Sequence, residues 1–279
     1  MIIVDQPGPL TTLQDLGRPG LAHLGVSPSG AADRTAHRLA NRLVGNAERR
    51  ATLEITLGGL TVTATDLVWM AVTGAPTGLL VSGRPGSSHG PFALAAGDQL
   101  VVQPPAHGVR NYLAVRGGFK VAKTLGSRST DLLSGLGPDP LRPGQRLAIG
   151  HTRKPMPDVD QAPPNEPRKT LTVRPGPRQD WFTDAAWTAL LDTAWTVTAD
   201  GNRVAVRLQG PELTRRITTE LPSEGLIRGA IQVPASGQPL IFLADHPVTG
   251  GYPVIAVLTD RSTDHAAQLR PGDQVRFGL

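Results

Sequence analysis

Residues 111–119, NYLAVRGGF, form an apolar strand candidate that runs into two glycines and an aromatic residue. Residues 240–252, LIFLADHPVTGGY, repeat this pattern in the second half of the chain. SRSTD at 127–131 and DRSTD at 260–264 follow at the same offset as the two glycine pairs. Because these matches keep one order along the chain, the sequence predicts two copies of one β-rich unit.

Short strand candidates separated by turn residues dominate the chain. The 32 glycines and 26 prolines among 279 residues are typical of many turns and argue against long helices. Two amphipathic segments, 33–44 and 184–192, predict one helix in each copy. We therefore expect a mainly β protein with two small β-barrels and a few short helices. The strand candidates are 67–72, 99–103, 111–115, 193–198, 203–208 and 239–244.

A Pro-rich, charged segment separates the two copies. Residues 151–169, HTRKPMPDVDQAPPNEPRK, contain few apolar side chains, as is typical of a linker. The sequence predicts a first β domain over 1–150, a linker over 151–169 and a second β domain over 170–279.

Composition argues against several classes of function. The chain has no cysteine, its seven histidines form no closely spaced pair, and no Walker A loop is present, so we expect neither a metal site nor a nucleotide bound by that loop. The net charge is only +5 and the basic residues are scattered, which argues against nucleic-acid binding. No apolar run of about 18 residues occurs, so we expect a cytoplasmic protein with no membrane span or signal peptide.

The stretch GSSHG at 86–90 matches the nucleophile-elbow pattern G-x-S-x-G. That motif requires a strand before the serine and a helix after it. Pro85 and Pro91 flank the stretch in an all-β context, so the sequence predicts an ordinary loop here.

Polar side chains embedded in glycine-rich, apolar stretches form the candidate binding site. Such glycines let the backbone approach a ligand, and neighbouring carboxylates and amides suit a small amide or ureido group. For any single residue, turn formation is the alternative. The set as a whole favours a site, because turns rarely need Arg128, Glu224 and Gln232 as well. The candidate substrate-binding residues are Gln14, His23, Ser29, Asp33, Glu54, Arg128, Ser129, Thr249, Gly250, Gly251 and Tyr252.

Residues 8–46, GPLTTLQDLGRPGLAHLGVSPSGAADRTAHRLANRLVGN, resemble the opening of the allophanate hydrolase subunit 2 family, also called the biotin-dependent carboxyltransferase-like family. The match continues through YLAVRGGF at 112–119, LGSRSTDLLSGLG at 125–137, SEGLIRGAIQVPASGQPL at 223–240, LADHPVTGGYPVIA at 243–256 and QLRPGDQVRF at 268–277. The resemblance covers nearly the whole chain. It implies two cyclophilin-like β-barrel domains, in agreement with the internal repeat.

The first function implied by the resemblance is that of the C subunit in an ATP-dependent 5-oxoprolinase, which opens a cyclic amide to glutamate. It implies two partners, a smaller cyclophilin-like B subunit and the A subunit, with ATP used by another polypeptide of the complex. No cofactor is expected on this chain itself.

The same resemblance suggests roles for individual residues. We expect Glu224 to be a buried general base with a raised pKa. Asn202, Gln232 and the backbone N–H groups at Gly250 and Gly251 would stabilise the oxyanion. Arg128 would pair with the substrate carboxylate, and Asp245 completes the predicted catalytic set.

Two other functions remain open. One is a biotin-dependent carboxyltransferase or allophanate hydrolase-type subunit of urea or amide metabolism, with biotin on a partner. The other is a non-enzymatic antagonist that binds a kinase-inhibitor-like partner. The family usually has Met at Ala32, Arg-Gln-Thr at 246–248 and often a basic residue at Val254. These departures lie near the proposed pocket and weigh against carboxyl transfer.

Overall fold

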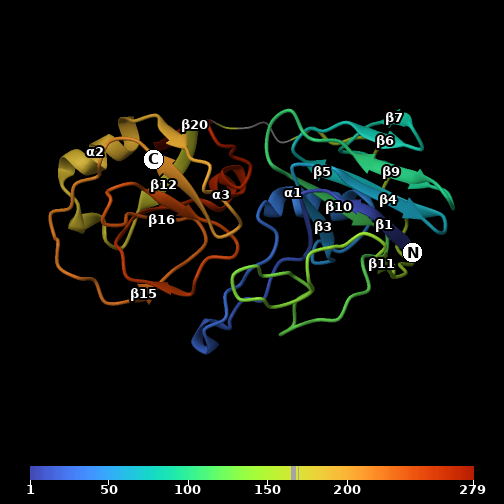
Figure 1. Ribbon diagram of the computed structural model, residues 1–279, viewed down its shortest axis with the longest axis horizontal. Helices are drawn as coiled ribbons and strands as arrows, with labels where there is room; N and C mark the ends of the chain where they lie inside the picture. Colours follow the sequence, from blue (N-terminus) through green and yellow to red (C-terminus); the bar gives the residue numbers. More distant parts are fainter. Residues whose placement is uncertain (165–167, 169) are drawn as a thin grey trace. The chain divides into compact units, whose positions relative to one another are not determined.

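The computed structural model describes residues 1–164, 168 and 170–279, which form two compact units. Unit 1 comprises 1–18, 29–131 and the described part of 135–166, and unit 2 comprises 19–28, 132–134 and the described part of 167–279. Strands dominate each unit (Figure 1), so the predicted mainly β class is confirmed. Two short segments from the first half of the sequence thus belong to unit 2.

Unit 1 contains two sheets. The first has the strand order β11 (Arg146–Leu147), β1 (Ile2–Pro7), β4 (Leu60–Ala64), β9 (Gln99–Val102), β6 (Leu79–Val81) and β7 (Arg84–Gly86). The second has the order β2 (Leu10–Gln14), β3 (Thr52–Thr56), β10 (Arg110–Val115), β5 (Val68–Gly74) and β8 (Pro91–Leu94). Gly86 ends β7, and residues 87–90 form a loop that connects β7 to β8, so a strand and not a helix follows Ser88, as the predicted loop requires.

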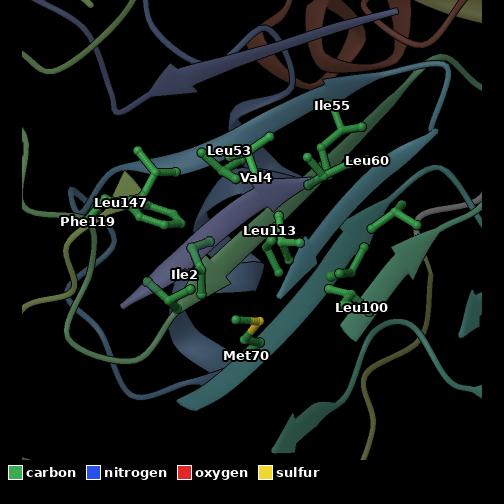
Figure 2. Close-up of a cluster of buried hydrophobic side chains, with 14 of the residues drawn as sticks. Ile2, Val4, Leu53, Ile55, Leu60, Met70, Leu100, Leu113, Phe119 and Leu147 are labelled. Atoms are coloured by element: carbon green, nitrogen blue, oxygen red, sulfur yellow. The ribbon is translucent and has the colours of Figure 1, made fainter. Parts of the chain in front are cut away.

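One hydrophobic core lies between the two sheets of unit 1. Ile2, Val4 and Leu60 come from the first sheet, and Leu53 and Leu113 come from the second (Figure 2). Burial of these apolar side chains supplies the main driving force for folding of the unit.

Helix α1 (Arg34–Leu43) covers the outer face of the second sheet. Its Ala36, Ala40 and Leu43 pack with Tyr112 and Ala114 of β10. Strand β10 is therefore buried on both faces, which explains why residues 112–115 are apolar without alternation.

Residues 151–164 of the predicted linker belong to unit 1 and contact the rest of it at several points. The Arg116 guanidinium donates to the carbonyl of Lys154, and Ala162 N–H donates to the carbonyl of His89 at 2.7 Å. A Cβ on Gly45 would lie 3.1 Å from the Pro155 carbonyl oxygen. Residues 165–167 and 169 of the predicted linker lie outside the described residues.

Unit 2 is built on a closed barrel. The strand order is β12 (Thr170–Pro175), β19 (Val254–Leu258), β16 (Ala230–Gln232), β17 (Leu240–Phe242), β14 (Ala205–Gln209), β13 (Trp195–Val197) and β20 (Gln274–Gly278). A parallel pairing between β12 and β20 closes it. Strands β12 and β20 alternate buried and exposed residues, as expected where one face lines the barrel core and the other faces solvent.

Short helices and a small ribbon complete unit 2. The helices are α2 (Asp184–Asp192), α3 (Asp260–Ala266) and the 3-10 turns η1 (Ala22–Leu24) and η2 (Gln179–Trp181), and the ribbon pairs β15 (Glu224–Gly225) with β18 (Thr249–Gly250). Helix α2 matches its predicted bounds, with Thr183 accepting a hydrogen bond from Ala186 N–H as its N-cap. Helix α3 was not predicted. It forms from DRSTD, whereas the matching SRSTD in unit 1 is not helical.

A buried ion pair lies inside unit 2. Arg203 donates two hydrogen bonds of 2.9 Å to the Asp245 carboxylate, and the exposed fractions of the two side chains are 2% and 0%. Leu132 N–H, from one of the segments contributed by the first half of the sequence, donates to the same carboxylate at 3.0 Å. The pair therefore fixes a loop of the chain as well as the barrel.

His37 on α1 makes the stability of unit 1 dependent on pH. Its Nδ1 lies 2.8 Å from Thr52 Oγ1 and its Nε2 lies 2.9 Å from the Glu48 carbonyl. Burial lowers the pKa of His37 from 6.5 to about 4. Between these two values the unfolded chain binds the proton and the folded protein does not. The free energy of unfolding therefore falls as pH decreases through this range.

We predict that His37→Gln removes this contribution, which amounts to about 3 kcal/mol at the acid end. Urea unfolding followed by circular dichroism at several pH values between about 7 and about 4 measures it. The exposed His107→Gln variant should keep the wild-type pH dependence. An equally steep loss of stability in His37→Gln and the wild type would contradict the assignment.

We also predict that Asp245→Asn lowers the free energy of unfolding by about 3–5 kcal/mol, because it leaves the Arg203 charge buried without its partner. Asp184→Asn is the matched control. It breaks a pair with Arg216 whose side chains are 55% and 95% exposed, so stability should stay close to that of the wild type. Similar unfolding curves for the two variants would contradict a structural role for the buried pair.

Candidate functional site

The ribbon in unit 2 carries several of the predicted site residues. Glu224 pairs with Gly250 across the ribbon, and Gly225 pairs with Thr249. Leu226 N–H continues the contact by donating to the Val248 carbonyl at 2.8 Å. The backbone therefore holds the Glu224 side chain beside the glycine pair at 250–251.

Arg178 holds the Glu224 carboxylate. Its Nε lies 2.9 and 3.0 Å from the two carboxylate oxygens, and its Nη2 also donates to Oε1. Arg178 is itself placed by its backbone N–H, which donates to the Val254 carbonyl at 3.1 Å just before η2. The two side chains are 36% and 32% exposed, so the pair lies at the surface.

Gln232 lies under the same ribbon. It is the last residue of β16, and its Nε2 donates to the Tyr252 carbonyl at 2.9 Å. A Cβ on Gly250 would lie 2.8 Å from that Nε2 and 2.8 Å from Leu226 Cδ1, so no side chain fits there without movement. The absence of a side chain at 250 is what allows Gln232 to approach the ribbon.

Arg215 and Tyr252 complete the group. The Arg215 guanidinium carbon lies 5.8 Å from the centre of the Tyr252 ring, and its Nη2 donates to the Val233 carbonyl. Burial lowers the pKa of Arg215, whereas Tyr252 is 47% exposed. We call Arg178, Arg215, Glu224, Gln232, Gly250 and Tyr252 the Glu224 cluster.

The environment of Glu224 differs from the prediction. We expected a buried carboxylate with a raised pKa, but Glu224 is part-exposed and hydrogen bonds from Arg178 lower its pKa. The carboxylate is therefore ionised at neutral pH and held by a cation. Its role as a base stays a prediction, but the physical reason we gave for it was wrong.

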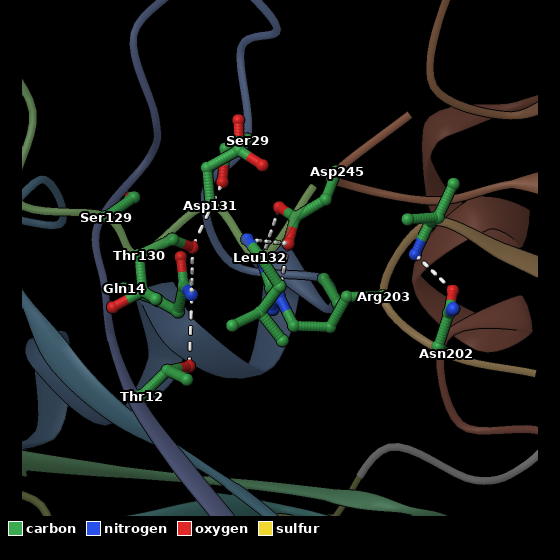
Figure 3. A network of polar contacts seen from close by, with 12 residues as sticks. Thr12, Gln14, Ser29, Ser129, Thr130, Asp131, Leu132, Asn202, Arg203 and Asp245 are labelled. Carbon is green, nitrogen blue, oxygen red and sulfur yellow. Dashed lines mark hydrogen bonds and ion pairs between the residues drawn. The ribbon is translucent and has the colours of Figure 1, made fainter. Parts of the chain in front are cut away.

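The other predicted residues of unit 2 lie in different surroundings. Asn202 is exposed, and its side-chain oxygen accepts from the N–H groups of Val204 and Ala205 at 2.7 and 3.2 Å, an arrangement typical of a turn. Asp245 is enclosed in the ion pair with Arg203 (Figure 3). His23 is exposed on η1. Gly251 is exposed beside Gly250.

In unit 1, the predicted Arg128 and Ser129 surround a carboxylate that the prediction left out. Asp15 accepts hydrogen bonds from Gly17 N–H, Ser127 Oγ, Ser129 Oγ and Arg128 N–H, all between 2.6 and 2.8 Å. The Arg128 side chain turns back, and its Nε donates to the Val121 carbonyl at 2.8 Å. That guanidinium helps to close its own loop, so the predicted contact with a substrate carboxylate gains no support from this arrangement.

The side chains of Gln14 and Ser29 both contact the backbone carbonyl of Thr130, the residue after Ser129 (Figure 3). Gln14 Nε2 donates to the Thr130 carbonyl at 2.8 Å and to Thr12 Oγ1 at 3.0 Å, and Ser29 Oγ lies 3.3 Å from the same carbonyl. Ser29 has a φ of 52°, in the left-handed region that a serine rarely adopts. The structure thus brings Gln14, Ser29 and Ser129 to one loop in unit 1.

Glu54 and Asp33 position the start of α1. Glu54 Oε2 accepts from Ala32 N–H at 2.9 Å and from the Tyr112 hydroxyl at 2.8 Å, and that hydroxyl oxygen accepts from Asp33 N–H at 2.7 Å. Asp33 Oδ1 accepts from Ala36 N–H as the N-cap. Burial raises the pKa of Tyr112, and the nearby negative charge of Glu54 adds to the effect. These contacts are those of a structural network at the N-terminus of the helix.

Sequence reasoning missed Arg178 and Arg215. Arg178 follows the Gly176-Pro177 pair, a turn signal that hid it, and Arg215 stands in a polar segment without a motif. Both become candidate site residues only through contacts with residues distant in sequence, Arg178 with Glu224 and Arg215 with Tyr252.

A cavity of about 360 Å³ lies near the Glu224 cluster, beside strands β14 and β17 of the barrel. Leu240, which lines it, pairs with Gln232 on one side and with Arg207, also in the lining, on the other. Thr198, Gln209 and Gln238 are further lining residues. None of the predicted site residues lines this cavity. We place the candidate chemistry at the Glu224 cluster because it combines a carboxylate, an amide and two guanidinium groups.

Two features are absent from the residues that the structure describes. They contain no group of three or more His, Asp or Glu side chains arranged to hold a metal ion. Nor does any of their helices have the length and apolar character needed to cross a membrane.

Comparisons with known proteins agree with this architecture. A protein from Escherichia coli (strain K12), named as the C subunit of 5-oxoprolinase, is 37% identical over 280 residues, covering 99% of this chain and 90% of that protein. Urea amidolyase from Lachancea kluyveri is 31% identical over 98% of this chain but only 16% of its own length. The solved structure of TTHA0988 superposes with a TM-score of 0.91 at 35% identity, covering all of this chain and 56% of that longer one.

The family described as "Carboxyltransferase domain, subdomain A and B" matches residues 24–279, which is most of the chain and includes the Glu224 cluster. The full-length relatives and the closed barrel of unit 2 point the same way. The chain therefore belongs to the carboxyltransferase domain family of subdomains A and B.

Proposed function

We propose that this chain is the C subunit of a 5-oxoprolinase, which converts the cyclic amide 5-oxo-L-proline to L-glutamate together with partner subunits. The observation that carries the proposal is the similarity to the E. coli 5-oxoprolinase protein, which extends over 99% of this chain and 90% of that relative.

The chemistry of the Glu224 cluster suits hydrolysis of an amide. Water must add to the carbonyl carbon, the C–N bond must break, and the departing nitrogen must take up a proton. An ionised carboxylate such as Glu224 can accept the proton from the attacking water. The second N–H of the Gln232 amide and the backbone N–H groups at Gly250 and Gly251 can stabilise the negative charge on the oxygen.

The A and B subunits of the complex are the partners in this proposal. An unactivated lactam carbonyl is a poor electrophile, so one of these partners would transfer the terminal phosphoryl group of ATP to its oxygen, leaving ADP. That group would leave as inorganic phosphate when water completes the hydrolysis to glutamate. This chain binds no cofactor of its own in this scheme. It supplies the carboxylate, the amide and the guanidinium groups that hold and position the substrate.

A second candidate is a carboxyltransferase that acts on urea or a related amide, with biotin carried by a partner. It is favoured by the similarity to urea amidolyase, which covers 98% of this chain. This alternative requires a biotinylated partner, and activity should disappear when biotin is withheld. Besides its partner subunits, the 5-oxoprolinase proposal requires ATP and 5-oxoproline but no biotin.

We predict that the purified chain, mixed with the A and B subunits of the complex, releases glutamate from 5-oxoproline in the presence of ATP. Omitting this chain should abolish release. The glutamate is quantified by a coupled dehydrogenase assay. No release from a complex that has assembled, as judged by size-exclusion chromatography, would contradict the proposal, and biotin dependence would then be measured.

A matched pair of glutamate variants serves as the control within the same assay. Glu224→Gln should reduce turnover by about 100-fold or more if the carboxylate accepts the proton. Glu220→Gln removes an exposed carboxylate four residues earlier and should retain wild-type turnover. Unchanged turnover in Glu224→Gln would remove Glu224 from the reaction.

A further inference from the structure

Arg178 and Glu224 form a pair with the geometry of a ligand site. A guanidinium that meets both oxygens of a carboxylate is the arrangement by which arginine recognises carboxylate ligands. Here the carboxylate comes from the chain itself. Both side chains are about one-third exposed, so solvent and small solutes reach the pair.

Two glycines flank this pair and place no side chain over it. A Cβ built on Gly225, the residue after Glu224, would meet nothing within 4 Å. Gly251, which follows the partner strand, is exposed, and a Cβ there would only touch the Leu221 carbonyl oxygen at 3.5 Å. The ribbon therefore carries no side chain at 225 or 251 that would cover the Arg178–Glu224 pair, whose side chains stay 36% and 32% exposed.

Other members of the cluster suit a small ring that carries a carboxylate. The Tyr252 ring is 47% exposed and offers an apolar surface, while Arg215 adds a second positive charge at that ring. Gln232 is only 4% exposed and is held by its bond to the Tyr252 carbonyl, which gives the site a fixed amide. The bond from Gln232 and the pairing of the ribbon therefore link a cation, an aromatic ring and an amide in one cluster.

We propose that Arg178 is the carboxylate-binding residue of this chain, and that Glu224 occupies the place of the ligand carboxylate until the ligand enters. Entry of a small cyclic carboxylate transfers Arg178 from Glu224 to the ligand. Glu224 is then released from its cation while it lies beside the bound ring. The choice of 5-oxo-L-prolinate as the ligand rests on the proposed function.

This exchange has an energetic consequence for Glu224. While it is paired, the bonds from Arg178 favour its ionised form. Once Arg178 bonds to the ligand, that stabilisation is shared and the carboxylate becomes a stronger proton acceptor. Substrate binding would thus prepare the base, and water would be activated only when a substrate is present.

Calorimetric titration of the purified chain with 5-oxo-L-prolinate tests the proposal. 2-Pyrrolidinone, which has the same lactam ring without the carboxylate, is the matched ligand and should bind at least about tenfold more weakly. Arg178→Gln should weaken 5-oxo-L-prolinate binding by about tenfold or more. Glu224→Gln should strengthen it by about two- to fivefold, because the neutral amide competes less well for Arg178.

The opposite signs of these two effects distinguish the proposal from a simple contact role. If Glu224 merely touched the ligand, Glu224→Gln would weaken binding. Arg178→Lys keeps the charge but not the two-point geometry, and should recover part of the affinity. Arg216→Gln, at an exposed arginine paired with Asp184, should leave binding unchanged.

Several results would overturn the proposal. These are no binding of 5-oxo-L-prolinate to the chain, equal binding of the two lactams, or full affinity in Arg178→Gln with an unchanged circular dichroism spectrum. Measuring glutamate release by the wild-type complex distinguishes failure of the Arg178 exchange from failure of the proposed function. Release without an Arg178 effect refutes only the exchange, whereas Arg178-dependent binding without release refutes only the assigned reaction.

Discussion

The Glu54 carboxylate, enclosed in unit 1, organises the polar contacts at the start of α1. A buried negative charge is tolerated only when hydrogen-bond donors and cations surround it. Glu54 has the Ala32 N–H and the Tyr112 hydroxyl on one oxygen, and the other lies 3.5 Å from Arg110 Nε. Through these contacts it joins β3, β10 and the start of α1.

The same constraint explains which acidic residues remain available for chemistry. Asp15 is surrounded by hydroxyl and backbone donors, and Asp245 is enclosed by Arg203 and Leu132 N–H. Carboxylates held in this way cannot change partners without destabilising their unit. Glu224 differs because its single arginine partner lies at the surface, where exchanging one carboxylate for another costs little. The carboxylate that we propose as the base, Glu224, lies on the ribbon and not in a strand of the barrel.

Patterns that depend on local spacing predicted the elements well. Helix α2 has its predicted bounds, α1 is one residue shorter at each end, and the strand candidate at 111–115 became β10. Helix α3 was missed because its seven residues are mostly polar and its Thr259 cap resembles any turn threonine. Local sequence alone does not decide the structure of the repeat, because the nearly identical SRSTD and DRSTD are loop in unit 1 and helix in unit 2.

The site was predicted less completely, for a physical reason. Glycine-rich stretches identified Glu224, Gln232 and Gly250, which the fold does bring together. They also identified Asp33 and Glu54, whose polar groups serve a helix start, and the resemblance added Asn202, whose amide oxygen closes a turn. Sequence patterns cannot tell a carboxylate that is fully hydrogen-bonded from one that can change partners. That difference, like the partnership of Arg178 with Glu224, arises from contacts across the fold.

The pH titration of the Glu224 carboxyl carbon by nuclear magnetic resonance, without and with 5-oxo-L-prolinate, tests the central claim most directly. Comparison with Glu224→Gln identifies the signal. The account predicts a pKa below the ordinary glutamate value in the free chain, because Arg178 bonds to the carboxylate, and a higher pKa once the ligand is bound. A pKa raised in the free chain, or one that the bound ligand leaves unchanged, would contradict it.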